Sequence, residues 1–227
     1  NVSHELRTPL TSVKSYTETL LDGALQEPSI VEHFLEVIND ETDRMTRLVK
    51  DLLTLSQHDG GINLNIEDIS IAELVSSCVE RLQRESKLKN QDLKLSIKQN
   101  IPLIEGDRYR IDQLLINIIG NAIKYTPEKG RINVKVYHEK EYVIIRVEDN
   151  GIGIPEEDLA RVFERFYRVD KARSRQLGGT GLGLAIAKEI AVLHGGDISI
   201  KSKVGKGTQL SVKLPIRRRL KQHLIAN

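Results

Sequence analysis

The sequence predicts two parts of different fold class: a helical hairpin that forms a dimeric four-helix bundle, followed by an α+β sandwich with a mixed sheet and helices on one face. The first 57 residues carry apolar side chains at helical spacing, whereas from Ile62 onward short alternating segments are interleaved with helical ones. A short, turn-like stretch separates the two patterns. We therefore expect a hairpin over 1–57, a linker over 58–61, an α+β domain over 62–216 and a basic tail over 217–227.

Length and charge narrow the class of protein. The chain has 227 residues, of which 39% are hydrophobic and 29% charged, as is typical of folded domains. Its net charge is +2, and four of the positive charges lie in the tail, at Arg217, Arg218, Arg219 and Lys221. The rest of the chain is therefore close to neutral. Proteins that bind nucleic acid use positive charge to neutralise phosphates, so we expect no nucleic-acid partner.

Cysteine content and hydropathy bear on the compartment. Cys78 is the single cysteine, which excludes an internal disulfide and fits a reducing compartment. The chain shows no signal peptide and no apolar run of membrane-spanning length. Because it starts within a motif at Asn1, without a methionine, we expect a fragment whose sensor, membrane anchor or linker would lie upstream.

The hairpin prediction rests on two helices with one apolar face each. The first helix is expected from the start of the chain to about Asp22, with Gly23 as its stop, and the second from Pro28 to near Gln57. Helical spacing continues without interruption through the apolar residues of the second helix, which are Ile30, Phe34, Val37, Ile38, Met45, Leu48, Val49, Leu52 and Leu53. Two such helices cannot bury both faces alone, so the sequence predicts a homodimer through this region.

His4 lies on the polar side of the first predicted helix. The apolar side chains that fall opposite it at 100° per residue are Val2, Leu6, Val13 and Leu20, with Leu10 nearby. Pro9 cannot bond back to the carbonyl of Glu5, so we expect the helix to kink or loosen beside His4. An exposed imidazole beside an acid indicates a nucleophile presented to another domain, although a lone histidine such as His4 is more often an ordinary surface histidine.

The second part alternates between strands and helices. Strands are expected at 62–66, 93–97, 104–107, 132–137, 142–148, 197–202 and 208–214. Helices are expected at 71–89, 110–125, 156–160 and 181–194, with Cys78 as a small buried residue on the first of them. This succession predicts a mixed sheet with helices on one face.

The helix over 110–125 carries a narrow polar strip on an otherwise apolar surface. Asn117, Asn121 and Lys124 stand at i, i+4 and i+7, and therefore within about 60° of one another. Asparagine oxygens suit Mg²⁺ and a lysine suits phosphate, so the strip indicates a nucleotide site. Spacing alone leaves a solvated strip as an equal alternative.

Two glycine-rich segments follow elements in a way that suits a ligand. Asp149-Asn150-Gly151-Ile152-Gly153 follows an alternating strand, and its glycines allow close approach of the backbone to a ring, although such turns are common. Gly178-Gly179-Thr180-Gly181-Leu182-Gly183-Leu184 opens a helix, so its amides form an anion site. It is neither a P-loop nor a Rossmann fingerprint, because the lysine of the first and the preceding βαβ unit of the second are missing.

Several contiguous strings resemble one family. SHELRTPL around His4 resembles the H box of the sensor histidine kinases of two-component systems. NIIGNAIKYT resembles their N box, DNGIG the G1 box, FERFYR the F box and GGTGLGL the G2 box, so that the resemblance covers nearly the whole chain from Asn1 to about Pro215. It implies a phosphoacceptor hairpin followed by an ATP-binding domain of the Bergerat (GHKL) type.

The resemblance implies ATP-dependent autophosphorylation of His4 and transfer of the phosphoryl group to an aspartate on the receiver domain of a response regulator. Glu5 would accept a proton from the imidazole, and Arg165 would stabilise the transferring phosphoryl group. Thr8 matches the position that orients water when such kinases also act as phosphatases.

The resemblance also implies a binding role for each motif of the second part. Asn121 would hold Mg²⁺, with Asn117 and Lys124 close to the phosphates of ATP. The adenine would be read by Asp149 with Gly151 and Gly153, and packed by Tyr125. The remaining nucleotide contacts would come from Arg168, Gly179, Thr180, Gly181, Leu182, Gly183 and Thr208. Residues 169–177, with Lys171, Arg173 and Arg175, would form an ATP lid, although by composition they read as a basic surface loop.

Two other functions remain open on the residues alone. The same nucleotide fold serves ATPases and ATP-gated dimers in which no histidine is phosphorylated, and a dimeric scaffold with a degenerate nucleotide site is the non-enzymatic reading. An H box on its own hairpin distinguishes the kinases. NVSHELRTPLTS with FYRVDKARSRQLGGTGLGLAIAKEI resembles, more narrowly, a branch from low-GC Gram-positive bacteria that governs cell-wall homeostasis. The chain would then be the cytoplasmic portion of a bacterial membrane sensor.

Overall fold

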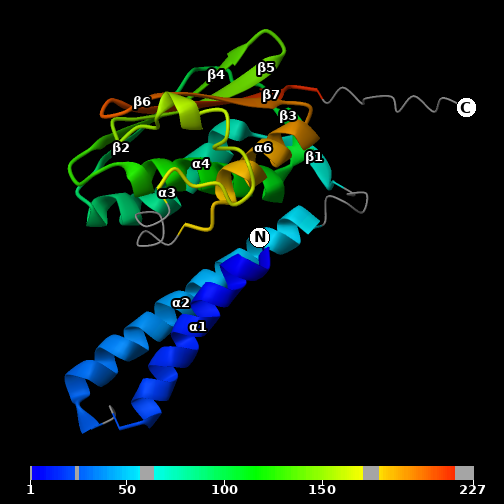
Figure 1. The fold of residues 1–227 in the computed structure, drawn as a ribbon. Helices are drawn as coiled ribbons and strands as arrows, with labels where there is room; N and C mark the ends of the chain where they lie inside the picture. Colours follow the sequence, from blue (N-terminus) through cyan, green and yellow to red (C-terminus); the bar gives the residue numbers. More distant parts are fainter. Residues whose placement is uncertain (1, 24–25, 57–63, 171–178, 218–227) are drawn as a thin grey trace, which may run out of the picture. The chain divides into compact units, whose positions relative to one another are not determined.

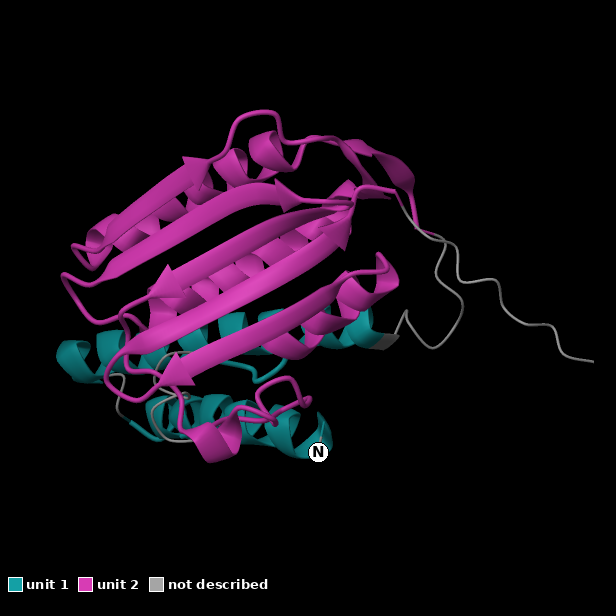
Figure 2. Ribbon diagram, turned by 90° about the horizontal axis from the view of Figure 1, so that it is seen from above, with its two compact units in different colours: residues 1–62, 170–182 teal, residues 63–169, 183–227 magenta. Residues whose placement is uncertain are grey.

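The computed structural model describes residues 2–23, 26–56, 64–170 and 179–217. The chain divides into two compact units, shown in different colours in Figure 2. Unit 1 comprises residues 1–62 and 170–182, and unit 2 comprises residues 63–169 and 183–227. The predicted linker at 58–61 lies outside the described residues, as does nearly all of the predicted tail.

Unit 1 contains the predicted hairpin. Helices α1 (Val2–Leu21) and α2 (Pro28–Ser56) lie side by side and run in opposite directions (Figure 1). The ring of Tyr16 meets that of Phe34 edge-on, with centroids 4.9 Å apart. The apolar side chains of these helices that are buried are Leu20, Leu48 and Leu55. Both predicted helices are therefore confirmed to within a residue or two.

His4 on the polar face of α1 is exposed as expected, but the apolar face of the helix is only partly covered. Pro9 is buried inside a helix that continues from Val2 to Leu21, so the proline does not end it. Leu10, which the helical pattern placed near the apolar stripe, is 57% exposed, and that expectation of burial is wrong within a single chain. The reason is that α2 covers only one side of α1.

Unit 2 is built on a mixed five-stranded sheet. Its order is β2 (Asp92–Ile97), β4 (Arg131–Glu139), β5 (Tyr142–Asp149), β7 (Gly207–Pro215) and β6 (Asp197–Lys203). The pair β2–β4 is parallel and the other neighbours are antiparallel, so the predicted mixed sheet is confirmed. The register pairs Val134 with Val147 and Ile145 with Val212, which places alternate apolar residues on one face.

A separate two-stranded ribbon joins β1 (Ile66–Ile69) to β3 (Ile104–Asp107). The strand expected at 62–66 is wrong: residues 64 and 65 lie outside the strand, and pairing begins at Ile66 opposite Asp107. The backbone N–H of Asn65 donates to the side chain of Asp107 at 3.1 Å and not to a backbone carbonyl of β3. The four residues of β3 set the length of the ladder.

Three helices cover one face of this sheet (Figure 1 and Figure 2): α3 (Ile71–Leu88), α4 (Arg108–Tyr125) and α6 (Gly183–Leu193). Ser70 caps α3 and Asp107 caps α4 through their side chains. Helix α4 contributes seven buried apolar side chains to the core, which are Ile111, Leu114, Leu115, Ile118, Ile119, Ala122 and Ile123. Cys78 is buried as predicted, and the helix expected near 156–160 is a single turn of 3₁₀ helix, Glu156–Asp158.

His194 anchors the end of α6, a role that sequence reasoning missed. Its imidazole is 1% exposed and lies between a donor and an acceptor. The backbone N–H of Asp107 donates to Nε2 at 2.9 Å, so the proton of the neutral ring is on Nδ1, which donates to the carbonyl of Ile190 at 2.8 Å. His194 thereby holds α6 against the start of α4.

Candidate functional site

His4 is exposed near the start of α1, and Glu5 beside it is half-buried. The carboxylate of Glu5 pairs with Nη2 of Arg44 on α2 at 3.6 Å, and Nη1 of Arg44 donates to Glu41 at 3.2 Å. Arg44 is a buried cation between two carboxylates, and sequence reasoning missed it. Its spacing of four residues from the buried Leu48 was the signal that this arginine faces α1.

Thr8 stands one turn after His4 on the same face of α1. Its hydroxyl donates to the backbone carbonyl of His4 at 3.3 Å. The bond is local, so the predicted neighbourhood of His4 and Thr8 follows from the helix itself.

The polar strip of α4 meets the start of α6. Asn117, Asn121 and Lys124 are each half-buried. Nδ2 of Asn117 is buried and has no hydrogen-bond partner among the described residues. Its Oδ1 lies 3.6 Å from the position that a Cβ on Gly183 would occupy, an ordinary contact distance, so Asn117 of α4 lies beside the first residue of α6. Ile116, an apolar residue of the same helix, is 41% exposed.

The end of α4 is tied to the loop after β5. The carbonyl of Tyr125 accepts from the N–H of Ile152 at 3.3 Å, and Nζ of Lys124 lies 5.2 Å from the centre of the Tyr125 ring. Gln91, which sequence reasoning did not single out, donates through Nε2 to the carbonyls of Ile123 and Thr126 at 2.9 and 2.7 Å. Backbone carbonyls at the end of a helix have no partner within the helix, so Gln91 stabilises the end of α4 that carries Lys124 and Tyr125.

Asp149 is held at the end of β5 by two backbone donors. Its Oδ1 accepts from the N–H of Gly151 at 2.8 Å and from that of Thr208 at 3.2 Å. Burial raises the pKa of the Asp149 carboxyl, and these two hydrogen bonds oppose the rise. The structure therefore brings Thr208, 59 residues away in the chain, next to the predicted base-reading aspartate.

Glycines permit this close approach. A Cβ on Gly151 would lie 2.7 Å from Oδ1 of Asp149, and one on Gly207 would overlap the carbonyl oxygen of Asp149. Gly207 also has a φ of +101°, a conformation that other residues avoid. Gly153, with a φ of +71°, completes the turn against β6.

The F-box segment lies beside α6. Nη2 of Arg165 pairs with Glu189 of α6 at 3.3 Å, and Arg168 is half-buried. Phe166 between them has a φ of +67°, which is rare for a bulky residue. The predicted lid residues Lys171, Arg173 and Arg175 lie outside the described part of the chain.

The segment Gly179-Thr180-Gly181-Leu182 belongs to unit 1. The hydroxyl of Thr180 donates to Oδ2 of Asp51 on α2 at 2.9 Å and accepts from the N–H of Leu182 at 3.3 Å. Burial raises the pKa of the Asp51 carboxyl, and the bond from Thr180 opposes the rise. Sequence reasoning did not predict a partner for Thr180 on the hairpin.

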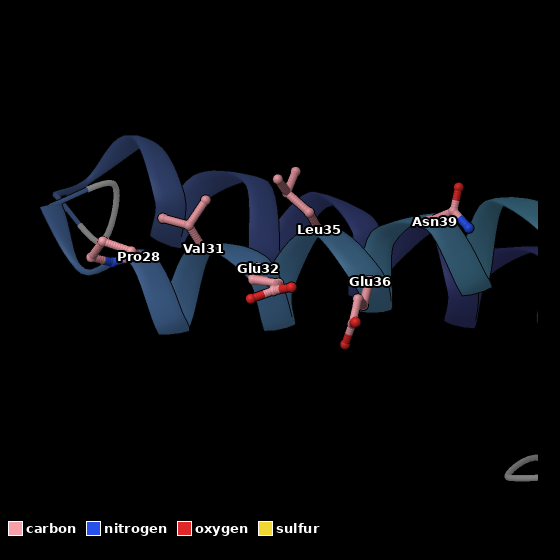
Figure 3. A pocket seen from close by; sticks show the side chains of 6 residues that line it. All are labelled: Pro28, Val31, Glu32, Leu35, Glu36 and Asn39. Carbon is pink, nitrogen blue, oxygen red and sulfur yellow. The ribbon is translucent and has the colours of Figure 1, made fainter.

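A shallow hollow on α2 gathers none of the predicted site residues. Figure 3 shows its lining, which consists of Pro28, Val31, Glu32, Leu35, Glu36 and Asn39. In the described residues no group of three His, Cys, Asp or Glu side chains is placed to hold a metal ion, and no helix is long and apolar enough to cross a membrane.

Two family models match the chain. Residues 1–61 match the His Kinase A (phospho-acceptor) domain, and residues 106–218 match the histidine kinase-, DNA gyrase B-, and HSP90-like ATPase family. The chain is 48% identical over 218 residues to the sensor histidine kinase WalK of Bacillus subtilis, covering 95% of this chain and 36% of that protein. It therefore spans about a third of that relative's length.

Solved structures agree with these matches. Histidine kinase AdeS of Acinetobacter baumannii superposes with a TM-score of 0.75 at 26% identity, covering 94% of this chain and 98% of that one. Histidine kinase ThkA, solved in complex with the response regulator protein TrrA, gives a TM-score of 0.78 at 25% identity, with 95% and 60% covered. The chain, with its phosphoacceptor hairpin and its ATPase-type domain, belongs to the sensor histidine kinases, in their WalK branch.

Proposed function

We propose that this chain uses ATP to phosphorylate its own His4 and then passes the phosphoryl group to an aspartate on the receiver domain of a response regulator. The observation that carries the proposal is the exposed imidazole of His4 on α1, within the residues that match a phospho-acceptor domain. The H box on its own hairpin distinguishes the kinases from ATPases of the same nucleotide fold. A solved relative in complex with a response regulator supports the class of partner.

At His4 the proposed reaction is a nucleophilic displacement. Glu5 accepts the proton of one ring nitrogen, and the other nitrogen attacks the γ-phosphorus of ATP. An N–P bond forms, the bond from phosphorus to the bridging oxygen breaks, and ADP leaves. Thr8 would orient the water that hydrolyses the regulator's aspartyl phosphate to inorganic phosphate, in a phosphatase activity that opposes the kinase.

The adenine is proposed to lie beside Asp149. Because Oδ1 of Asp149 is occupied by two backbone donors, Oδ2 is the oxygen that would accept from the amino group of the base. Gly151 and Gly153 would allow the ring to approach the backbone, Tyr125 would pack near it, and Thr208 would line the same edge.

The phosphates are proposed to meet the strip of α4 and the glycine-rich segment. The orphaned Nδ2 of Asn117 is a donor in need of an acceptor, and Lys124 supplies a positive charge. Further contacts would come from Arg168 and from the segment Gly179, Thr180, Gly181, Leu182 and Gly183. Arg165 would stabilise the transferring phosphoryl group, for which it must exchange its present partner, Glu189.

The residues present fit a bound Mg²⁺. The amide oxygen of Asn121 is a hard ligand on a half-buried helix face, and Mg²⁺ in nucleotide sites takes most of its other ligands from phosphates and water. When bound, the ion neutralises charge on the phosphate oxygens. Asn121 would hold the ion at this face of α4.

The proposal extends to the parent protein. The hairpin over 1–57 would dimerise and carry the phosphoryl group, 58–61 would act as a hinge, and 62–216 would bind ATP, with the basic end at 217–227 as a solvated tail. We place the chain in the cytoplasmic part of a membrane-anchored sensor in cell-wall homeostasis, attached through segments outside this sequence and without a nucleic-acid partner.

The test is autophosphorylation with γ-labelled ATP and Mg²⁺. We expect acid-labile, alkali-stable label on the parent chain and none on His4→Gln or Asn121→Ala. His33→Gln is the matched control, because His33 is also an exposed histidine of the hairpin. Hydrolysis of ATP without retained label, equal in the parent and in His4→Gln, would establish an ATPase instead.

A further inference from the structure

Ser202 on β6 connects three pieces of backbone at the edge of the proposed adenine site. Its Oγ lies 2.9 Å from the backbone nitrogen of Ile154, 2.8 Å from the carbonyl oxygen of Gly207 and 2.9 Å from Oγ1 of Thr208. Ile154 follows the turn that begins at Asp149. One hydroxyl therefore ties this turn to the start of β7.

The three contacts of Ser202 decide where the protons are. A serine hydroxyl has one proton and two lone pairs. The N–H of Ile154 occupies one lone pair, and the carbonyl of Gly207 can only accept, so it must receive the proton of Ser202. The second lone pair is then left for Thr208, whose hydroxyl has to donate to Ser202.

The opposite assignment, in which Ser202 donates to Thr208, is disfavoured by repulsion between two acceptor oxygens. If Ser202 gave its proton to Thr208, its remaining lone pair would face the carbonyl oxygen of Gly207 at 2.8 Å with no hydrogen between them. Two acceptors at that distance repel each other. Thr208 therefore has its proton committed, and its oxygen offers only lone pairs to the space beside it.

Thr208 adjoins Asp149 directly, because its own backbone N–H donates to Oδ1 of Asp149 at 3.2 Å. The carboxylate of Asp149, when ionised, is also an acceptor only. This edge of the site consequently presents two acceptors side by side.

We propose that Ser202 is a positioning residue that sets purine specificity by holding the proton of Thr208. With that proton held, the edge accepts directly from the 6-amino group of adenine and repels the 6-oxo group of hypoxanthine or guanine, which is itself an acceptor. Without Ser202, the hydroxyl of Thr208 is free to turn and donate to a 6-oxo group. The inference rests on the proposed placement of adenine beside Asp149.

The test is the ratio of the affinities for ATP and ITP, measured by calorimetry on the full chain with Mg²⁺. ITP has a 6-oxo group where ATP has a 6-amino group. We expect Ser202→Ala to lower the preference for ATP roughly 2- to 10-fold, the effect of one hydrogen bond. Ser202→Thr, which keeps the hydroxyl, should retain the preference. Ser199→Ala, an exposed serine on the same strand, is the matched control.

A second variant, at Thr208, keeps the inference testable even if Ser202→Ala fails to fold. Thr208→Val removes the hydroxyl but keeps the shape, so it should lower the preference by a similar factor, and adding Ser202→Ala should change the ratio no further. An equal loss of affinity for both nucleotides in Ser202→Ala, or an unchanged ratio in Thr208→Val, would overturn the inference.

These results separate the inference from the proposed function. If Asp149→Asn binds ATP as well as the parent does, adenine does not lie beside Asp149, and both the proposed placement of adenine and the inference are wrong. If ATP binding depends on Asp149 but the ratio of the affinities for ATP and ITP is unchanged in the Ser202 and Thr208 variants, the inference alone is wrong.

Discussion

The hairpin and the sheet domain differ in how they treat their apolar side chains. In the hairpin, Leu10, Leu21 and Leu53 are 57%, 73% and 59% exposed. In the sheet domain, Leu115 and Ile119 of α4 are completely buried between the sheet and the neighbouring helices. Two helices offer each other only one face, whereas a sheet covered by three helices encloses a core. The hairpin therefore needs a second copy, and the sheet domain does not.

The strongest test of this contrast removes the uncovered leucines of α2. Leu35 and Leu53 are 18 residues apart, five turns of helix, and so lie on the same side. In Leu35→Glu/Leu53→Glu we expect the dimer dissociation constant to rise at least about a hundredfold, since each leucine moved from water to an interface contributes about 1.5–3 kcal/mol.

Sedimentation equilibrium measures this change. Leu103→Glu is the matched control, because Leu103 of the sheet domain is as exposed as Leu35, at 53% each. ATP binding should be unaffected in the double variant. A dimer of unchanged affinity would show that this side of α2 is not the interface.

The converse test concerns the core of the sheet domain. We expect Leu115→Ala to lower the free energy of unfolding by about 2–5 kcal/mol, because a fully buried leucine leaves a cavity. Urea unfolding followed by circular dichroism measures it, with the exposed Leu103→Ala as control. The midpoint of this unfolding should not depend on protein concentration, whereas that of the hairpin should; the reverse pattern would contradict the contrast.

A smaller effect is expected on the pH dependence of the thermal stability of the sheet domain, because this domain buries the carboxyl of Asp149 along with its apolar side chains. Burial raises the pKa of this carboxyl in the folded state, so the ionised form costs stability at pH values above that pKa. The cost disappears as the pH falls and the carboxyl becomes protonated in both the folded and the unfolded state. We expect Asp149→Asn to unfold at a higher temperature than the parent at neutral pH, to lose this advantage on acidification, and to bind ATP poorly.

Thermal unfolding across this pH range is the measurement. Asp68→Asn, at an exposed position on β1, serves as the control. A parent that is more stable than Asp149→Asn at neutral pH would mean that the bonds from Gly151 and Thr208 outweigh the burial of the charge.

Patterns that are local in the chain predicted most of the fold. The helices α1, α2 and α4 and the strands β4 and β5 follow from apolar periodicity, because each side chain's face depends on its own position. The strand expected at 62–66 failed for the complementary reason. Its alternation was correct, but the length and start of β1 depend on β3, some 40 residues later.

The same division holds for the candidate site. His4, Asn121 and Asp149 stand in contiguous motifs, so the sequence by itself predicts them as site residues, and it determined the two-part architecture and the family. Only the tertiary structure decided the pairing of Arg44 with Glu5, the support of α4 by Gln91 and the hydroxyl pair of Ser202 and Thr208. The physical reason is that hydrogen bonds and ion pairs join atoms that are close in space, and spacing along one element carries no information about which distant residue will be there.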